Sequence, residues 1–158
     1  MELSKFKEVL LKVAVCAIAC DGDIDDREIE MLHKIEKESP YFSALNLSDI
    51  LEKSLDSCKK DLNTFKNNLL DILKGNTLNI VQELTILEIS LRIIAADEIE
   101  EDSERAFIND LRVHLDLDDF LIEQRFGDIP YLKPKNSEFN SRSSDDFKTI
   151  EKSSKLKK

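Results

Sequence analysis

The chain has 158 residues, which fits one domain by the usual length prior of roughly 100–200 residues. It carries 23 Lys and Arg against 33 Asp and Glu, and the resulting net charge of −10 excludes general binding of nucleic acid by the body of the chain. With only 3 Gly and 3 Pro, the chain lacks the turn residues of a many-stranded sheet, so its composition favours helices.

Apolar residues recur at spacings of three and four along residues 3–125, and no stretch shows the sustained alternation of a strand. Phe6, Val9 and Val13 begin the first such stripe, which Asp21-Gly22 ends. Further helices are expected to begin near residues 25, 48, 61, 77, 102 and 117. The sequence therefore predicts an all-α domain of about seven helices.

Residues 133–158 differ in composition, with eight Lys and Arg, four Asp and Glu and few large apolar side chains. Such a segment buries too little surface to offset the entropy of ordering, so we predict a disordered, basic Ser/Lys-rich tail after a domain at 1–132. The tail has a net charge of +4, against −14 for residues 1–132. A solubilising role, contact with the acidic body and peripheral contact with an anionic membrane are all open.

The run from Val13 to Cys20 is the longest uncharged apolar stretch, and it is too short for a membrane span of about 20 residues. The first residues alternate charge with apolar side chains and form no secretory signal, so a cytoplasmic location is expected. The odd number of 3 cysteines, with Cys16 and Cys20 one helical turn apart, does not indicate a disulfide framework.

The chain contains an internal repeat with an offset of 76 residues, which takes Asp21 to Asp97 and Glu28 to Glu104 without a gap. Coincidence between two amphipathic helices explains the apolar matches but explains the acidic matches poorly, so we interpret the repeat as a duplicated helical hairpin. The apolar matches include Leu10 with Ile86, Leu11 with Leu87, Val13 with Ile89, Leu32 with Ile108 and Ile35 with Leu111.

The same offset gives an expectation for two cysteines. Cys16 corresponds to Arg92, which predicts a partly exposed edge for Cys16. Cys20 corresponds to Ala96, which predicts a small packing residue. Neither cysteine needs a redox role, and the interpretation as packing thiols is favoured.

Two acidic segments, residues 19–28 and 95–104, connect the helices of each pair. The first reads Ala-Cys-Asp-Gly-Asp-Ile-Asp-Asp-Arg-Glu and the second Ala-Ala-Asp-Glu-Ile-Glu-Glu-Asp-Ser-Glu. Here the sequence resembles the TerB-like family, which is named for tellurite-resistance proteins and includes the N-terminal region of the DjlA co-chaperones. The recurrent element of that family is an apolar helix, then Ala-Asp-Gly, an acidic residue, an aliphatic residue, a polar pair and Glu. The second segment departs from it at Glu98, which replaces the glycine.

The resemblance implies an all-helical duplicated domain, an association with stress responses and a divalent-metal site at the acidic residues. Carried over by position, the metal ligands are Asp21 and Glu28 in the first copy and Asp97 and Glu104 in the second. Ca²⁺, Mg²⁺, Mn²⁺ and Zn²⁺ are the candidate cofactors.

The helix dipole distinguishes capping carboxylates from candidate ligands. Asp25, Asp26 and Glu28 lie at a predicted helix N-terminus, where an anion is stabilised by about 0.3–1 kcal/mol without a metal. Asp21 and Asp97 follow the C-termini of apolar helices, where the dipole disfavours an anion. Clustered carboxylates suit hard cations, and Asx-turns that satisfy loop amides are the alternative.

Motifs of several established chemistries are missing. His33 and His114 have no cysteine at zinc-ligand spacing, and the chain has no phosphate loop, nucleophile elbow or His-Pro-Asp signature of a J-domain. We therefore expect a non-catalytic binding or adaptor domain in a stress response, with a protein partner and with cation dependence at the acidic segments. A metal-dependent enzyme that uses the four carboxylates, and a purely structural partner for another helix, are the alternatives. The sequence predicts no particular oligomeric state.

Overall fold

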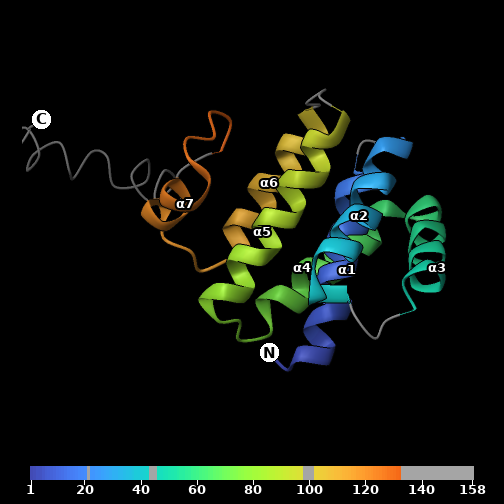
Figure 1. Ribbon diagram of the computed structural model, residues 1–158, viewed down its shortest axis with the longest axis horizontal. Helices are drawn as coiled ribbons and strands as arrows, with labels where there is room; N and C mark the ends of the chain where they lie inside the picture. Colours follow the sequence, from blue (N-terminus) through green and yellow to red (C-terminus); the bar gives the residue numbers. More distant parts are fainter. Residues whose placement is uncertain (21, 43–45, 98–101, 133–158) are drawn as a thin grey trace, which may run out of the picture. The chain divides into compact units, whose positions relative to one another are not determined.

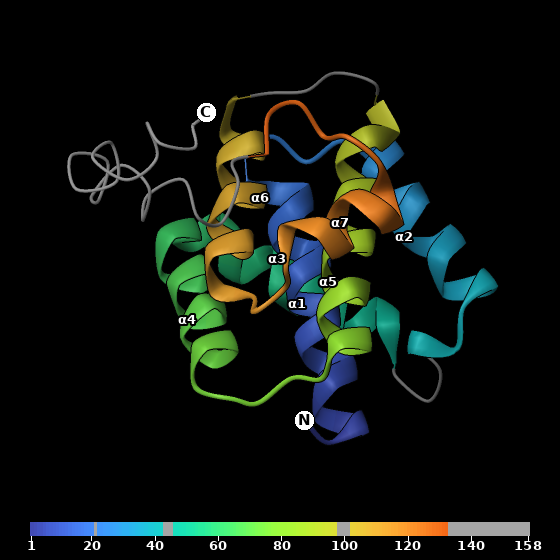
Figure 2. The same ribbon diagram turned by 90° about the vertical axis from the view of Figure 1, so that its left-hand side faces the viewer.

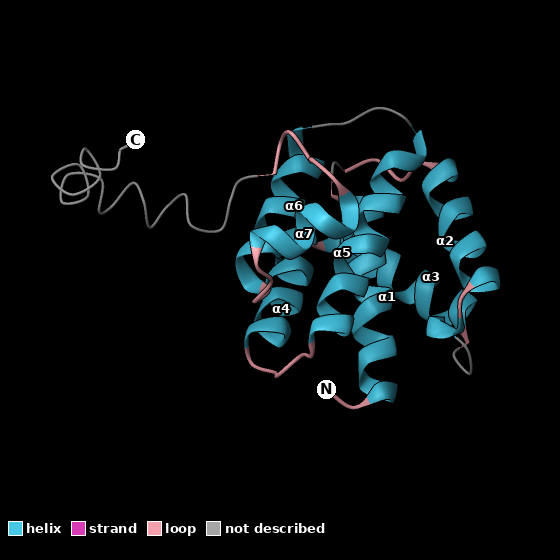
Figure 3. Ribbon diagram, turned by 60° about the vertical axis from the view of Figure 1, so that its left-hand side comes forward, coloured by secondary structure: helices cyan, strands magenta, loops and turns pink. Residues whose placement is uncertain are grey.

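The computed structural model describes residues 1–20, 22–42, 46–97 and 102–132, without the side chains of Tyr41 and Asp97. Over these residues the all-α prediction is confirmed, because they form seven α-helices and two short 3-10 helices and no strand (Figure 3). None of the helices in this part combines the length and the apolar character that a bilayer span requires. The elements are α1 Leu3–Ala19, α2 Asp26–Glu38, η1 Pro40–Phe42, α3 Leu47–Lys60, α4 Leu62–Lys74, α5 Ile80–Ile94, η2 Ala95–Asp97, α6 Asp102–His114 and α7 Asp119–Phe126.

The chain divides into two units, Met1–Leu117 and Asp118–Lys158. The first unit holds α1 to α6. The described part of the second holds α7 and a turn in which the Leu132 N–H donates to the Ile129 carbonyl at 3.0 Å. The predicted domain boundary after residue 132 and the predicted disordered tail at 133–158 concern residues outside the described part, so both stay predictions.

Helix α1 forms the centre of the first unit. Every residue from Val13 to Ala19 is buried, so the second half of this helix has no side that faces solvent. Helices α2, α3, α4 and α5 all contact α1, which lies among them in Figures 1 and 2. The four surrounding helices contribute buried apolar side chains to the same core, among them Leu32, Leu51, Leu69 and Ile86.

Two helix starts show how local hydrogen bonds set the boundaries. Asp61 caps α4 as predicted, because its carboxylate accepts hydrogen bonds from the Thr64 N–H at 3.1 Å and from the Thr64 hydroxyl at 2.7 Å. Helix α5 begins later than predicted, at Ile80, because Asn79 and Gln82 form a capping box in front of it. The Asn79 side chain accepts from the Gln82 N–H at 2.8 Å, and the Gln82 side chain accepts from the Asn79 N–H at 3.0 Å.

The observed helix limits support the predicted duplication. The offset of 76 residues carries Asp26–Glu38 onto Asp102–His114, which are the limits of α2 and α6, and it carries α1 onto α5 with one extra residue at each end. Five of the matched apolar pairs are buried in both copies, whereas Leu91, the match of Val15, and Met31, the match of Phe107, are half-buried. The five buried pairs are Leu10 and Ile86, Leu11 and Leu87, Val13 and Ile89, Leu32 and Ile108, and Ile35 and Leu111.

The repeat fails on one face of α1, and the prediction of a partly exposed Cys16 is wrong. Cys16 is 1 % exposed, whereas the side chain of Arg92 is 33 % exposed and pairs with Glu38 at 3.0 Å. Helices α3 and α4 pack on α1 and close this face. In the described chain only α7 follows α6, so the second hairpin is not followed by a matching pair of helices.

The cap at Asp61 predicts a pH dependence. The hydrogen bonds from the Thr64 side chain and then its backbone N–H hold the pKa of Asp61 below its usual value. The folded state therefore favours the charged carboxylate. Its contribution to stability is present above the unfolded pKa of about 3.9 and is lost as pH falls through the folded pKa.

We expect the Asp61→Asn variant to lose less stability than the wild type between pH about 5 and 2, because one carboxylate with a depressed pKa has been removed. Thermal melting across this pH range measures the effect. Asp56→Asn, at an exposed position of α3, is the control. An acid dependence of Asp61→Asn as steep as that of the wild type would contradict the role assigned to the cap.

Candidate functional site

Two carboxylates are buried at matching positions of the two hairpins. Glu28 lies in the first turn of α2 and Glu104 in the first turn of α6, and each residue is 1 % exposed. A glutamate is rarely buried to this extent, because removing a charge from water carries a large energetic penalty unless other groups compensate it. The repeat keeps this feature in both copies, which distinguishes the two glutamates from the exposed acidic residues around them.

The two other predicted ligands belong to the segments that connect the helices of each pair. Asp21 lies outside the described residues, and Asp97 is the last residue of η2 with a side chain that is not described. The structure therefore places Glu28 and Glu104 only, and the four-residue metal site stays a prediction.

Both hairpins turn at the same end of the first unit. The C-terminal ends of α1 and α5 and the N-terminal ends of α2 and α6 lie at the top in Figures 1 and 2. The short helix η2 contacts α2, which carries Glu28. One end of the fold is thus built from both copies of the repeat.

Gly22 follows the end of α1, and its backbone adopts the left-handed conformation. Its φ is 86°, and its N–H donates to the Ala19 carbonyl at 2.9 Å, as the predicted left-handed end of α1 requires. A Cβ at this position would meet no atom within 4 Å, so the backbone angle, and not the space, favours glycine. The corresponding residue of the second copy, Glu98, lies outside the described residues.

Two further acidic residues at the helix starts, Asp25 and Asp102, take part in local pairing. The Asp25 carboxylate accepts from the Arg27 N–H at 2.7 Å and pairs with the Arg27 guanidinium at 3.2 Å. The side-chain hydrogen bond and then the backbone one hold the pKa of Asp25 below its usual value. In α6, the Asp102 carboxylate lies 3.8 Å from the Arg105 guanidinium. Asp25 is therefore a cap, which needs no metal.

The described residues do not contain a complete set of metal ligands. With Asp21 and the Asp97 side chain outside this part, no group of three or more His, Cys, Asp or Glu side chains is placed to hold an ion. The oxygens of Glu28 and Glu104 are donors of the type that Ca²⁺, Mg²⁺ and Mn²⁺ prefer, while Zn²⁺ more often takes nitrogen and sulfur. The donor chemistry of the two buried carboxylates fits a hard cation better than zinc.

Arg112 is a buried charged residue whose burial the sequence did not predict. It is 1 % exposed, and within the described residues no other Lys or Arg side chain is buried. It follows Glu104 by about two helical turns, on the face of α6 that also holds Ile108 and Leu111. Its place within this apolar stripe is the signal that could have revealed its burial.

A cavity of about 480 Å³ lies where the end of α4, the start of α5 and the end of α6 meet. Its lining includes four residues with ionisable side chains, Lys74, Glu83, His114 and Asp116. Glu83 is 5 % exposed, and its Oε2 accepts from the Asp116 N–H at 2.7 Å, while the His114 Nδ1 lies 2.8 Å from the Asp110 carbonyl oxygen. These hydrogen bonds fix the C-terminal end of α6, which gives Glu83 a structural role.

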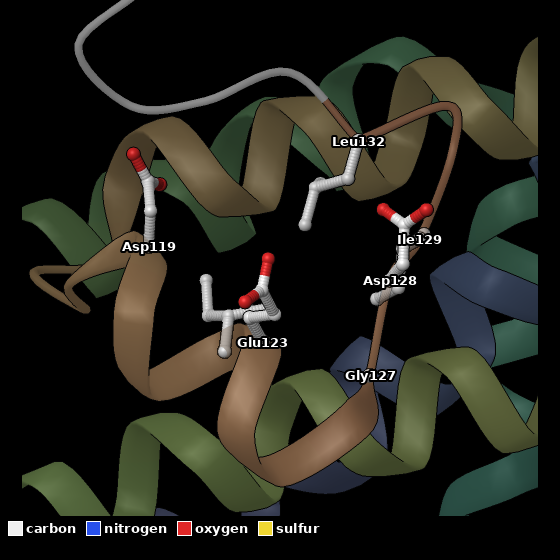
Figure 4. Close-up of a pocket in the computed structure, with 7 residues that line it drawn as sticks. Asp119, Glu123, Gly127, Asp128, Ile129 and Leu132 are labelled. Carbon is white, nitrogen blue, oxygen red and sulfur yellow. The ribbon is translucent and has the colours of Figure 1, made fainter.

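The second unit has a smaller cavity of about 140 Å³ between α7 and the segment that follows it (Figure 4). Asp119 and Glu123 project from α7, and Asp128 lies beyond Gly127, whose φ is 76°. Leu132 also lines this cavity. The duplicated glutamates line neither this cavity nor the larger one.

No protein-family model, curated protein or solved structure matches this chain. The resemblance to the TerB-like family therefore rests on the acidic segments and on the repeat, and it stays a prediction. The matching helix limits and the matching burial of the two glutamates support the repeat independently of that resemblance.

Glu28→Ala and Glu104→Ala should each lower the free energy of unfolding by about 1–3 kcal/mol, because each removes a buried carboxylate from the groups around it. Glu30→Ala, at an exposed position of α2, is the matched control and should change it by no more than about 0.5 kcal/mol. Urea denaturation measures all three variants. A loss of stability in only one of the two buried-site variants would contradict their equivalence.

Proposed function

We propose that the chain is a non-catalytic, TerB-like binding domain that acts as an adaptor or sensor in a stress response. Its functional surface is the end of the first unit where the two acidic segments connect their helices. A divalent cation bound through Asp21, Glu28, Asp97 and Glu104 controls that surface, and the partner is a protein.

The observation that carries this proposal is the burial of Glu28 and Glu104 at matching positions, each 1 % exposed. Burial of a carboxylate lowers stability unless an opposite charge or several hydrogen bonds compensate it. A duplication that kept the carboxylate in both copies favours a role beyond ending a turn. Carboxylate oxygens are also the donors that a hard cation prefers.

The acidic surface around the two glutamates favours a partner with a basic face. Asp23, Asp26 and Asp102 are exposed at the helix starts next to the buried carboxylates. Such an arrangement attracts opposite charge and repels phosphate backbones, which favours a protein over a nucleic acid.

The enzyme alternative makes a geometric demand that a binding surface does not. Metal-dependent catalysis requires carboxylates that converge on a concave site able to hold a substrate. Glu28 and Glu104 line neither the cavity of about 480 Å³ nor that of about 140 Å³.

Ca²⁺, Mg²⁺ or Mn²⁺ should raise the melting temperature of the wild type, and Zn²⁺ should do so less strongly. A ligand that binds only the folded state stabilises it by about 2.7 kcal/mol at a free concentration of one hundred times its Kd. The gain should vanish in the Asp21→Asn, Asp97→Asn double variant. It should persist in Asp23→Asn, Asp26→Asn, which removes the same charge from exposed positions. Superimposable melting curves with and without each ion would remove the cation from the proposal.

The adaptor role has its own test, an affinity pull-down from native cell extract with and without a chelator. We expect the wild type to retain a protein partner that chelator releases. The Asp21→Asn, Asp97→Asn variant should not retain it, and the Asp23→Asn, Asp26→Asn control should. Retention of the same partner by both variants would place the binding surface elsewhere.

A further inference from the structure

Two cysteines on different helices meet inside the first unit. Cys16 lies on α1 and Cys58 on α3, and these helices pack against each other. Cys16 is 1 % exposed and Cys58 is 5 % exposed, and their side chains are close enough for each thiol to shift the pKa of the other. Both are free thiols in the structure.

The third cysteine does not belong to this pair. Cys20 follows Cys16 by one turn of the same helix, where Cβ atoms are about 5–6 Å apart. A disulfide requires Cβ atoms about 3.5–4.5 Å apart, so a Cys16–Cys20 bond would distort the helix. The Cys20 thiol instead donates to the Ala17 carbonyl at 3.4 Å.

The two thiols differ in access and in acidity. Cys58 lines a cavity of about 310 Å³ together with Gly22, Ile24 and Lys59, whereas Cys16 does not line it. The hydrogen bond from Cys16 lowers the pKa of Cys58, while the same hydrogen bond and burial raise the pKa of Cys16. The thiolate is the reactive form of cysteine, so Cys58 is the sulfur that attacks and Cys16 the sulfur that resolves.

We propose that Cys58 and Cys16 form a peroxide-oxidisable pair that closes to a disulfide between α3 and α1. The Cys58 thiolate attacks one peroxide oxygen, the O–O bond breaks, and hydroxide leaves as Cys58 becomes a sulfenic acid. The Cys16 sulfur then attacks the Cys58 sulfur, the S–O bond breaks, and water leaves with the Cys16 proton. In total the two thiols lose two electrons and hydrogen peroxide is reduced to water, and a dithiol reverses the reaction.

The new bond would lie next to the first acidic segment. Gly22 and Ile24 of that segment line the cavity that Cys58 lines, so a link between α1 and α3 forms beside the turn of the first hairpin. None of the four proposed cation ligands takes part. The pair therefore goes beyond the proposed function and does not depend on it.

Peptide mapping of the Cys20→Ala chain after treatment with hydrogen peroxide tests the pair. In this variant the tryptic peptides 13–27 and 54–59 hold one cysteine each. We expect a species in which these two peptides are joined, which dithiothreitol separates, and a titration that falls from two thiols to none. In the unmodified chain, the same treatment should consume two of the 3 cysteines and leave Cys20.

Two variants separate the roles of the sulfurs. Cys16→Ala should form no link and should accumulate a sulfenic acid on Cys58 that dimedone traps, and Cys58→Ala should do neither. Circular dichroism establishes that each variant keeps its helices. Unchanged thiol counts in the Cys20→Ala chain, or links that form only between two chains, would overturn the proposal, and that result does not depend on the other variants folding.

Discussion

The burial of α1 on all sides is the constraint on which the rest of the first unit depends. Every residue from Val13 to Ala19 is withdrawn from water, so neighbouring helices must cover each face of this segment. Helix α5 covers one face, α2 another, and α3 with α4 the remainder. Helices α1 and α5 contact each other, and the two hairpins turn at one end of the unit (Figure 1), where Glu28 and Glu104 lie in the first turns of the second helices.

The helices between the two copies break the symmetry of the repeat. Helices α3 and α4 follow the first hairpin and pack on α1, so Cys16 is buried while its counterpart Arg92 pairs with Glu38. The same packing brings Cys58 of α3 against Cys16. The carboxylates follow the symmetry of the duplication, and the cysteine pair exists because that symmetry is incomplete.

The sequence was sufficient for the helical class and the cap at Asp61, because both depend on residues close in the chain, and for the repeat, because each copy keeps its own pattern of apolar and acidic residues. Prediction from the sequence failed where contacts between helices far apart in the chain determine the burial of a residue. The burial of Cys16 depends on α3 and α4, which a one-helix stripe does not describe. The start of α5 was predicted near residue 77, whereas the capping box of Asn79 and Gln82 places it at Ile80. Because Arg112 is charged, its position on the apolar face of α6 was not recognised. Glu28 and Glu104 were predicted as candidate ligands, but their burial was not predicted.

Two copies of one hairpin are proposed to keep a buried carboxylate for the same purpose. A crystal structure of the full chain grown with Mn²⁺ tests this claim most directly. We expect α1 and α2 to superpose on α5 and α6, Glu28 to fall on Glu104, and anomalous density to mark an ion beside both glutamates. Two hairpins that fail to superpose, or two glutamates that accept only loop amides with no manganese nearby, would contradict it.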